Sequence, residues 1–248
     1  MIPGRLTIHT YEYKIAERWS GAFIGDALAV RTLSQIRNIC TRYADIHKYD
    51  YIIIDTSPSL GSLNKVIIST VDGFIIPCLP DMFSLYGIRN IGKALKAWKV
   101  EFTTLFTLLS KPKRAQFPEK LVRFLGFTIY NAKKYADDDR NDLALAHYNY
   151  AKQIPDTIFK FIPEDIRNII PDETMKESIG GNAVMHSHNT LPNMAQKYKH
   201  PIWEIPDIPN LDAEDRPTIS GNRLRYTQTK EKYKLFAKDL MKRMRFLS

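Results

Sequence analysis

The sequence predicts an α/β fold, in which a mostly parallel sheet is flanked by helices. Two observations support this fold class. Short apolar runs alternate along the chain with segments whose apolar residues recur at helical spacing. The runs are also apolar throughout, which is typical of strands that are covered on both faces, as in a parallel sheet.

The individual elements follow from these patterns. The expected strands cover residues 5–11, 51–54, 73–78, 122–131 and 157–163. The expected helices cover residues 28–46, 62–70, 84–98 with a continuation at 101–110, 137–153 and 226–246. Asp26 directly precedes the first of these helices and provides a carboxylate that can cap it.

The residue composition of the chain changes after the last expected strand. We assign residues 1–199 to one α/β domain, although their polar stretch at 178–193 is typical of a loop. Residues 200–222 are rich in proline and predict an extended connection. Residues 223–248 predict a basic amphipathic helix.

Length and composition exclude several classes of protein. The chain has 248 residues, of which 44% are hydrophobic, enough for one sizeable core. No apolar run is long enough to cross a bilayer, and residues 1–14 lack the apolar region of a signal peptide. Two cysteines, Cys40 and Cys78, are too few for a disulfide framework or a four-cysteine zinc site. We therefore expect a cytoplasmic protein without a membrane span.

The positive charge is concentrated at one end of the chain. The whole chain carries a formal net charge of +9. Residues 223–248 hold nine Lys and Arg and two Asp and Glu, so this segment accounts for +7 of that charge. A basic segment attracts nucleic acid or an acidic partner, and the alternative is the solvated face of an ordinary helix.

Polar residues stand where two of the expected strands end. Asp55 follows the run 51–54, and Asn131 closes the run 122–131. In open α/β sheets ligands bind beyond the carboxyl ends of the strands. A carboxylate there can hold a magnesium ion, and an amide can pair with the edge of an adenine. Taken alone, an Asp in this position is more often a turn or helix-cap residue than a metal ligand, and an Asn is more often a turn residue.

A longer pattern around Asp55 resembles a known family. Residues 49–95 read YDYIIIDTSPSLGSLNKVIISTVDGFIIPCLPDMFSLYGIRNIGKAL. This segment resembles the central part of the ParA/MinD-type, or deviant Walker, partition ATPases. The shared features are a strand that ends in Asp55, the turn Pro58-Ser59-Leu60, a second strand with a proline turn, and the helix start FSLYGI. The resemblance extends to the IPG at 2–4 and to the strand ends at Asn131 and Pro163, so it covers about residues 2–170.

The resemblance implies a fold and a set of binding residues. It implies the P-loop NTPase fold of the ParA/SIMIBI type, with ATP and Mg²⁺ as cofactors. Asp55 is the implied magnesium residue of the Walker B strand. Pro58, Asn131 and Pro163 are the implied further residues around the nucleotide.

The resemblance also implies a biological role. Proteins of this family act in plasmid and chromosome partition, where ATP drives dimerisation and the dimer binds DNA non-specifically. A ParB-like partner stimulates them. We therefore expect a homodimer associated with the nucleoid in the cytoplasm.

One part of the family's pattern is missing from this sequence. No glycine-rich loop with the family's lysines occurs in the 248 residues, so the fold is expected to be incomplete at its N-terminus. We expect a truncated form of a longer ATPase, unable to hydrolyse ATP alone, and we assign no catalytic residue. The alternative is a degenerate relative, a non-catalytic DNA-binding or adaptor protein on an ATPase scaffold.

The basic C-terminal helix supplies the candidate DNA contacts. They are Arg225, Lys230, Lys234, Lys238, Lys242 and Arg245. Two alternatives remain open for this helix. It resembles the membrane-binding terminal helix of MinD relatives, and its aromatic and methionine-rich stripe also suits packing on the domain.

Overall fold

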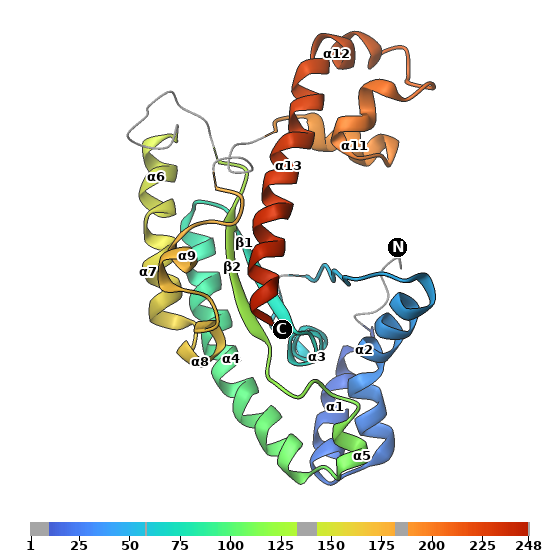
Figure 1. Cartoon of the computed structure of the whole chain (residues 1–248), viewed down its shortest axis with the longest axis vertical. Helices are drawn as coiled ribbons and strands as arrows, with labels where there is room; N and C mark the ends of the chain where they lie inside the picture. Colours follow the sequence, from blue (N-terminus) through green and yellow to red (C-terminus); the bar gives the residue numbers. More distant parts are fainter. Residues whose placement is uncertain (1–9, 58, 133–142, 182–187, 248) are drawn as a thin grey trace. The chain divides into compact units, whose positions relative to one another are not determined.

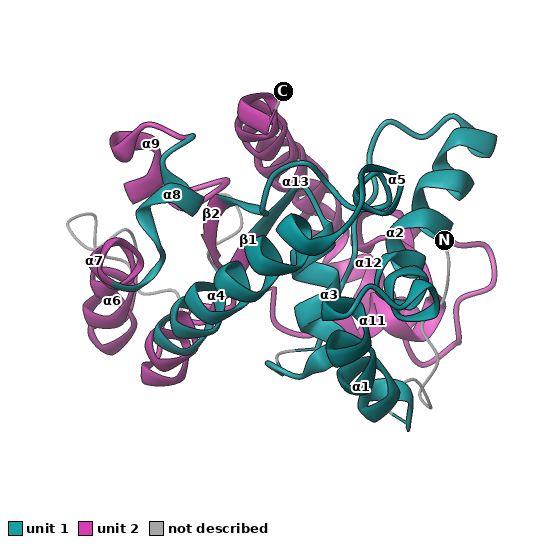
Figure 2. Ribbon diagram, turned by 90° about the horizontal axis from the view of Figure 1, so that it is seen from below, with its two compact units in different colours: residues 1–74, 89–124, 161–169 teal, residues 75–88, 125–160, 170–248 magenta. Residues whose placement is uncertain are grey.

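The computed structural model describes residues 10–57, 59–132, 143–181 and 188–247 (Figure 1). The chain divides into two compact units, which Figure 2 shows in separate colours. Unit 1 comprises residues 1–74, 89–124 and 161–169, and unit 2 comprises residues 75–88, 125–160 and 170–248. We describe each unit by itself.

Unit 1 is mainly helical. It contains α1 (Glu12–Phe23), α2 (Ala27–His47), α3 (Ser62–Thr70), most of α4 (Met82–Leu108), α5 (Lys111–Arg114) and α8 (Glu164–Arg167). Its core is a cluster of buried apolar side chains, most of them from these helices: Trp19, Ala22, Ala29, Val30, Leu33, Val66, Phe102, Leu105, Leu109 and Phe117. The helices thus pack through the apolar face that their residue spacing defines.

A tight turn joins the first two helices. Gly25 adopts a positive φ of 77°, a conformation that glycine tolerates without strain. The carboxylate of the next residue, Asp26, accepts a hydrogen bond of 2.9 Å from the N–H of Leu28 and so caps α2. The predicted cap and helix are therefore confirmed, whereas α1 was not predicted.

The sheet of the described residues is small. Strands β1 (Gly73–Cys78) and β2 (Arg123–Ile129) pair in parallel, which confirms two of the expected strands. The N–H of Arg123 donates to the carbonyl of Asp72 at 3.0 Å, and the N–H of Tyr130 donates to that of Cys78 at 3.1 Å. Between these two bonds the second strand therefore has one residue more than the first. Gly126, at a φ of 126°, provides the backbone freedom for this bulge.

Unit 2 contains one long helix and several short ones. They are α6 (Leu145–Ala151), α7 (Gln153–Phe161), α9 (Asp172–Lys176), α11 (Leu191–Tyr198), the 3₁₀ helix η3 (Ile202–Asp207), α12 (Arg216–Gly221), α13 (Arg223–Met244) and the 3₁₀ helix η4 (Arg245–Leu247). Buried side chains of α11, η3, α12 and α13 form a small core: Leu191, Ile202, Ile205, Ile219 and Tyr226. Figure 1 shows this group of helices around the first half of α13.

Two expected strands are absent. Residues 51–54 form no strand, and their side chains are largely exposed, with Ile53 at 87%. A strand needs a neighbouring strand to pair its backbone, and in the described chain no backbone hydrogen bond joins this segment to another one. The expected strand 157–163 instead forms the end of helix α7, because Ile154 and Ile158 lie one turn apart and are both buried.

The remaining boundaries differ in detail. Residues 84–98 and their continuation form one helix, α4. Residues 5–9 of the first expected strand lie outside the described part, and Thr10 and Tyr11 form a 3₁₀ turn before α1. Of the expected helix 137–153, residues 137–142 also lie outside it, and helix begins at Leu145. The segment 200–222 is not extended, since it forms η3 and α12.

Candidate functional site

The turn after Asp55 is held by a side chain of helix α3. Asn64 is almost fully buried, and its amide nitrogen donates hydrogen bonds of 2.6 Å to the carbonyls of Ser57 and Ser59. Pro58 lies outside the described residues. The Pro-Ser-Leu turn is thus fixed to the helix that follows it. Sequence reasoning missed Asn64, although an asparagine shortly after a turn is a recognisable signal.

Asp55 itself is exposed. Among the described residues, no three His, Cys, Asp or Glu side chains gather into a group that could hold a metal ion. The sequence also lacks a glycine–lysine phosphate loop. The described residues therefore do not fit a complete magnesium–nucleotide site, and one carboxylate is the only predicted metal ligand they supply.

Asn131 and Pro163, which the sequence analysis assigned to nucleotide binding, lie next to the ends of secondary structure elements. Asn131 follows strand β2 and adopts a left-handed conformation with a φ of 56°. Asparagine is one of the residues that tolerates this conformation. Pro163 is the residue before helix α8, and its carbonyl accepts the N–H of Ile166 at 3.1 Å. Asp55 and Pro163 belong to unit 1 and Asn131 belongs to unit 2, so their predicted meeting at a nucleotide stays a prediction.

Helix α13 presents most of its basic residues to solvent. The six residues predicted to contact DNA are all exposed, five on α13 and Arg245 in η4: Arg225, Lys230, Lys234, Lys238, Lys242 and Arg245. The four lysines follow one another at intervals of four residues and thus form a slowly winding stripe on the helix. Lys234 also makes an ion pair of 2.6 Å with Glu231. Exposed cations in such a row suit the phosphates of a nucleic acid.

The opposite side of α13 carries a buried arginine. Arg243 is 1% exposed, and its guanidinium donates to the carbonyls of Leu125 at 3.2 Å and Glu177 at 2.9 Å. Burial lowers the pKa of this guanidinium, and the nearby carboxylate of Asp239 opposes the shift. Sequence reasoning missed Arg243. Its position seven residues after Phe236, on the apolar stripe, is the signal that could have revealed it.

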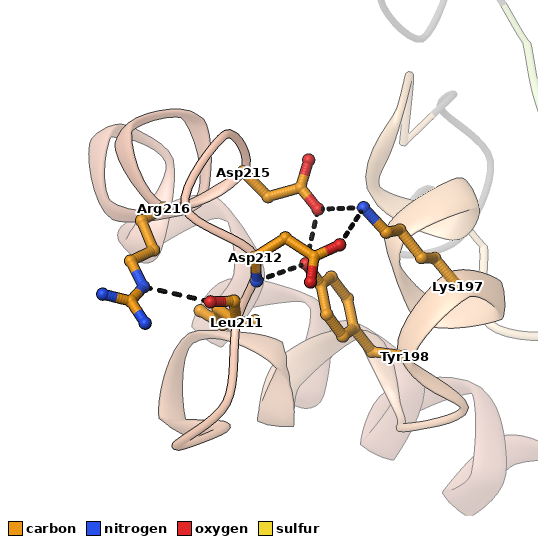
Figure 3. A network of polar contacts seen from close by, with 6 residues as sticks. All are labelled: Lys197, Tyr198, Leu211, Asp212, Asp215 and Arg216. Atoms are coloured by element: carbon orange, nitrogen blue, oxygen red, sulfur yellow. Dashed lines mark hydrogen bonds and ion pairs between the residues drawn. The ribbon is translucent and has the colours of Figure 1, made fainter.

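A polar network fixes the segment between η3 and α12 (Figure 3). The ammonium group of Lys197 lies 2.6 Å from a carboxylate oxygen of Asp212 and 2.6 Å from one of Asp215. The hydroxyl of Tyr198 donates to Asp215 and accepts the N–H of Asp212 at 3.1 Å. Hydrogen bonds from Lys197 and then Tyr198 hold the pKa of Asp215 below its usual range.

Unit 2 also contains a cavity of about 580 Å³ beside strand β2. Its lining includes the apolar side chains of Phe127, Ile129 and Leu143 and the charged side chains of Lys152 and Asp239. None of the nucleotide residues predicted from the sequence lines this cavity in the described structure. Among the described helices, none has the length and apolar character needed to span a bilayer.

Part of the chain is similar to known proteins. Residues 30–107 match the model of the AAA_31 family, an AAA domain. A ParA family protein of Mycoplasma genitalium is 30% identical over 66 residues, which are 27% of this chain and 24% of that protein. A ParA family protein of Mycoplasma pneumoniae is also 30% identical over 66 residues, which are 27% of this chain and 24% of that protein.

A third relative is an uncharacterized protein of Methanocaldococcus jannaschii, 42% identical over 57 residues, which are 22% of this chain and 20% of that protein. The chain thus spans about a quarter or less of the length of the curated relatives it matches. No solved structure matches the chain. The matched AAA segment includes Asp55, strand β1 and most of α4, which are the elements that carry the resemblance. The family match and the named relatives support a ParA-like family for this chain.

Proposed function

We propose that this chain is the Walker B-containing portion of a ParA-like ATPase of plasmid or chromosome partition. The observation that carries the proposal is the match of residues 30–107 to an AAA domain, because this segment contains Asp55 and the turn that Asn64 holds. In the intact protein ATP drives dimerisation, and a ParB-like partner stimulates hydrolysis. The protein acts in the cytoplasm on the nucleoid.

The proposed contribution of this chain to DNA binding lies in helix α13. Its Arg225, Lys230, Lys234, Lys238 and Lys242, together with Arg245 of η4, bind phosphates without reading the base sequence. The exposed positions of Lys230, Lys234, Lys238 and Lys242 support this role. A row of lysines that spans twelve residues of helix is about 18 Å long, which is enough to follow several phosphates.

The proposed contribution to nucleotide binding is limited to one side of the site. In the intact protein Asp55 would hold magnesium, and Pro58, Asn131 and Pro163 would border the nucleotide. Bound magnesium would neutralise phosphate charge, and a carboxylate such as Asp55 would position it. The chain has no glycine–lysine loop of its own, and we expect no ATP turnover from it alone.

The second candidate is a non-catalytic DNA-binding or adaptor protein on a degenerate ATPase scaffold. The exposed position of Asp55, which belongs to no group of three possible metal ligands among the described residues, is the observation that favours it. The coding sequence directly upstream of Met1 distinguishes the two candidates. An in-frame glycine–lysine loop there supports the partition ATPase, whereas its absence supports the adaptor.

ATP turnover by the purified 248-residue chain provides a biochemical test. We expect a rate equal to that of buffer for the wild type and for Asp55→Ala. Asp50→Ala is the matched control, because Asp50 is an exposed carboxylate of the same segment. Turnover that Asp55→Ala abolishes and Asp50→Ala retains would contradict the proposal that the chain alone is inactive.

A further inference from the structure

Two neighbouring side chains of helix α3 connect different parts of unit 1, which Figure 2 shows in teal. Asn64 and Lys65 both lie near the start of α3, which begins at Ser62. Successive residues of a helix point about 100° apart, so the two side chains reach different neighbours. Asn64 contacts the turn at residues 57–60, whereas Lys65 contacts helices α1 and α4.

The contacts of Asn64 fix the turn to α3. Its side-chain amide has two hydrogens, and its 2.6 Å bonds go to two carbonyls, those of Ser57 and Ser59. Asn64 is 3% exposed, and a buried amide that loses its partners is unfavourable. In the described part of the chain, none of the hydrogen bonds of this side chain reaches α1 or α4. A displacement of the turn therefore either breaks both bonds or moves the start of α3.

The contacts of Lys65 fix α3 to two other helices. Its ammonium group forms an ion pair with Glu101 of α4 and lies 4.1 Å from the centroid of the Trp19 ring of α1. The Lys65 side chain is 13% exposed, and Trp19 belongs to the core of unit 1. Ion pairs and cation–π contacts are stronger when they are shielded from water. The position of Lys65 is therefore coupled to the positions of α1 and α4.

The backbone of α3 joins the two sets of contacts. The N–H of Lys65 donates to the carbonyl of Gly61 at 3.0 Å, and Gly61 directly follows the turn. Helix α1 also contacts this point, because a Cβ atom at Gly61 would overlap Oε1 of Glu12. This carboxylate oxygen is buried and has no hydrogen-bond partner among the described residues. In such close packing a shift of the turn displaces the start of α3 and its contacts with α1.

We propose that Asn64 and Lys65 form a link through which the arrangement of the turn and the contacts of α3 with α1 and α4 change together. Asn64 is the positioning residue at the turn, and Lys65 transmits its position to Trp19 and to α4. The role of the link rests on the proposed function, in which Pro58 of this turn would border the nucleotide. The link would then carry nucleotide occupancy to α1 and α4. The coupling itself needs no nucleotide, since it is a property of the contacts in this chain.

The test uses fluorine NMR of the full chain labelled with fluorotryptophan. The chain has three tryptophans, and the resonance of each is assigned by its change to phenylalanine. We expect Asn64→Ala to shift the Trp19 resonance and to leave those of Trp98 and Trp203 in place. A purely structural role of Asn64 would lower the stability without this selective shift. If Asn64→Ala loses helix content, Asn64→Ser, which keeps one donor, is used in the same measurements.

Two further variants test the route. In a Lys65→Met background, Asn64→Ala no longer shifts the Trp19 resonance, because the side chain that contacts the ring is gone. Asn38→Ala is the matched control, since it removes a side-chain amide of α2 in the same unit, which donates to Ser34 at 3.3 Å. This control leaves the Trp19 resonance in place.

An unshifted Trp19 resonance in Asn64→Ala, or the same shift with and without the Lys65 side chain, overturns the proposal. So does an equal shift in Asn38→Ala, or a shift of all three resonances in Asn64→Ala. The measurement contains no nucleotide, so its outcome is separate from that of the ATP turnover test. A failure of the link therefore leaves the proposed function standing, and a failure of the proposed function leaves the link standing.

Discussion

On helix α13 the guanidinium of Arg243 lies one turn from the carboxylate of Asp239, with 3.6 Å between Nε and Oδ1. The other carboxylate oxygen of Asp239 accepts the N–H of Gly180 at 3.0 Å. The same guanidinium binds the carbonyls of Leu125 and Glu177. The ion pair of buried Arg243 with partly exposed Asp239 thus connects α13, strand β2 and the segment 177–180 of unit 2.

Replacing Arg243 by methionine tests this connection. We expect Arg243→Met to lower the free energy of unfolding by about 3 kcal/mol, because Asp239 and two carbonyls lose their partner. Urea unfolding followed by circular dichroism measures the change. Arg223→Met, on the same helix as Arg243, is the control. Arg223 forms an exposed ion pair with Asp207 of η3, so its replacement should cost less than about 1 kcal/mol. Equal losses in the two variants would contradict the account of Arg243.

Gly126 permits the close approach of Arg243 to strand β2. A Cβ atom at this position would lie 2.4 Å from Nη1 of Arg243, and the φ of 126° is strained for any other residue. We expect Gly126→Ala to destabilise the protein by about 1–3 kcal/mol. Gly87→Ala in α4 is the control and should stabilise by about 0.5–1 kcal/mol, because its Cβ meets no atom within 4 Å. Thermal unfolding shifts of the same sign would show this reasoning to be wrong.

The Lys197–Asp215 ion pair predicts a dependence of stability on pH. Its partners lower the pKa of Asp215 in the folded state, so the pair stabilises the protein above the ordinary aspartate pKa of about 3.9. The stabilisation is lost as the pH falls through the lower, folded-state pKa. We expect Asp215→Asn to be less stable than the wild type at pH 7 and to approach it as the pH falls below about 3.9. A difference that is constant with pH in urea unfolding would rule out this linkage.

The two cysteines should differ in reactivity. Cys78 is fully buried, and burial together with the carboxylate of Asp81 raises its pKa to about 12. Cys40 is partly exposed. Because the thiolate is the reactive form, we expect a disulfide reagent at pH 8 to modify one thiol in the native protein and both in urea. Cys40→Ser should remove the rapid reaction, and rapid native modification of Cys78 would be inconsistent with its burial.

The predictions from sequence are correct for those elements whose local sequence signals agree with their tertiary surroundings. Helix α2 has both a periodic apolar face and the Asp26 cap. Strands β1 and β2 are apolar runs that pair with each other. The strand expected at 51–54 is wrong because strand formation depends on a neighbour, which local sequence does not supply. The segment 157–163 is a short, mostly apolar run like those of the expected strands, but Ile154 and Ile158 define a helical face that begins before it.

The residues of the candidate sites likewise include some that could be predicted from the sequence and some that could not. The exposure of the α13 lysines follows from their spacing, and so it could be predicted. The role of Asn64 depends on how the turn folds back on α3, which the sequence alone indicates only weakly. Arg243 was missed because a charged residue is expected on the exposed face of an amphipathic helix, and its burial requires partners from β2 and residue 177.

Salt dependence of DNA binding tests most directly the proposal that α13 binds phosphates. The affinity for a random-sequence duplex is measured between 50 and 200 mM salt, roughly the range in which counterion release dominates. Lys230, Lys234, Lys238 and Lys242 are changed to Gln together. The control changes four exposed lysines of unit 1, namely Lys93, Lys96, Lys111 and Lys120, and so removes the same charge. We predict that the affinity of the wild type and of the control falls steeply with salt. For the α13 variant, the slope of the logarithm of the binding constant against the logarithm of the salt concentration should be shallower by about three to four. Equal slopes for the two quadruple variants, or wild-type binding that salt does not weaken, would contradict the proposal.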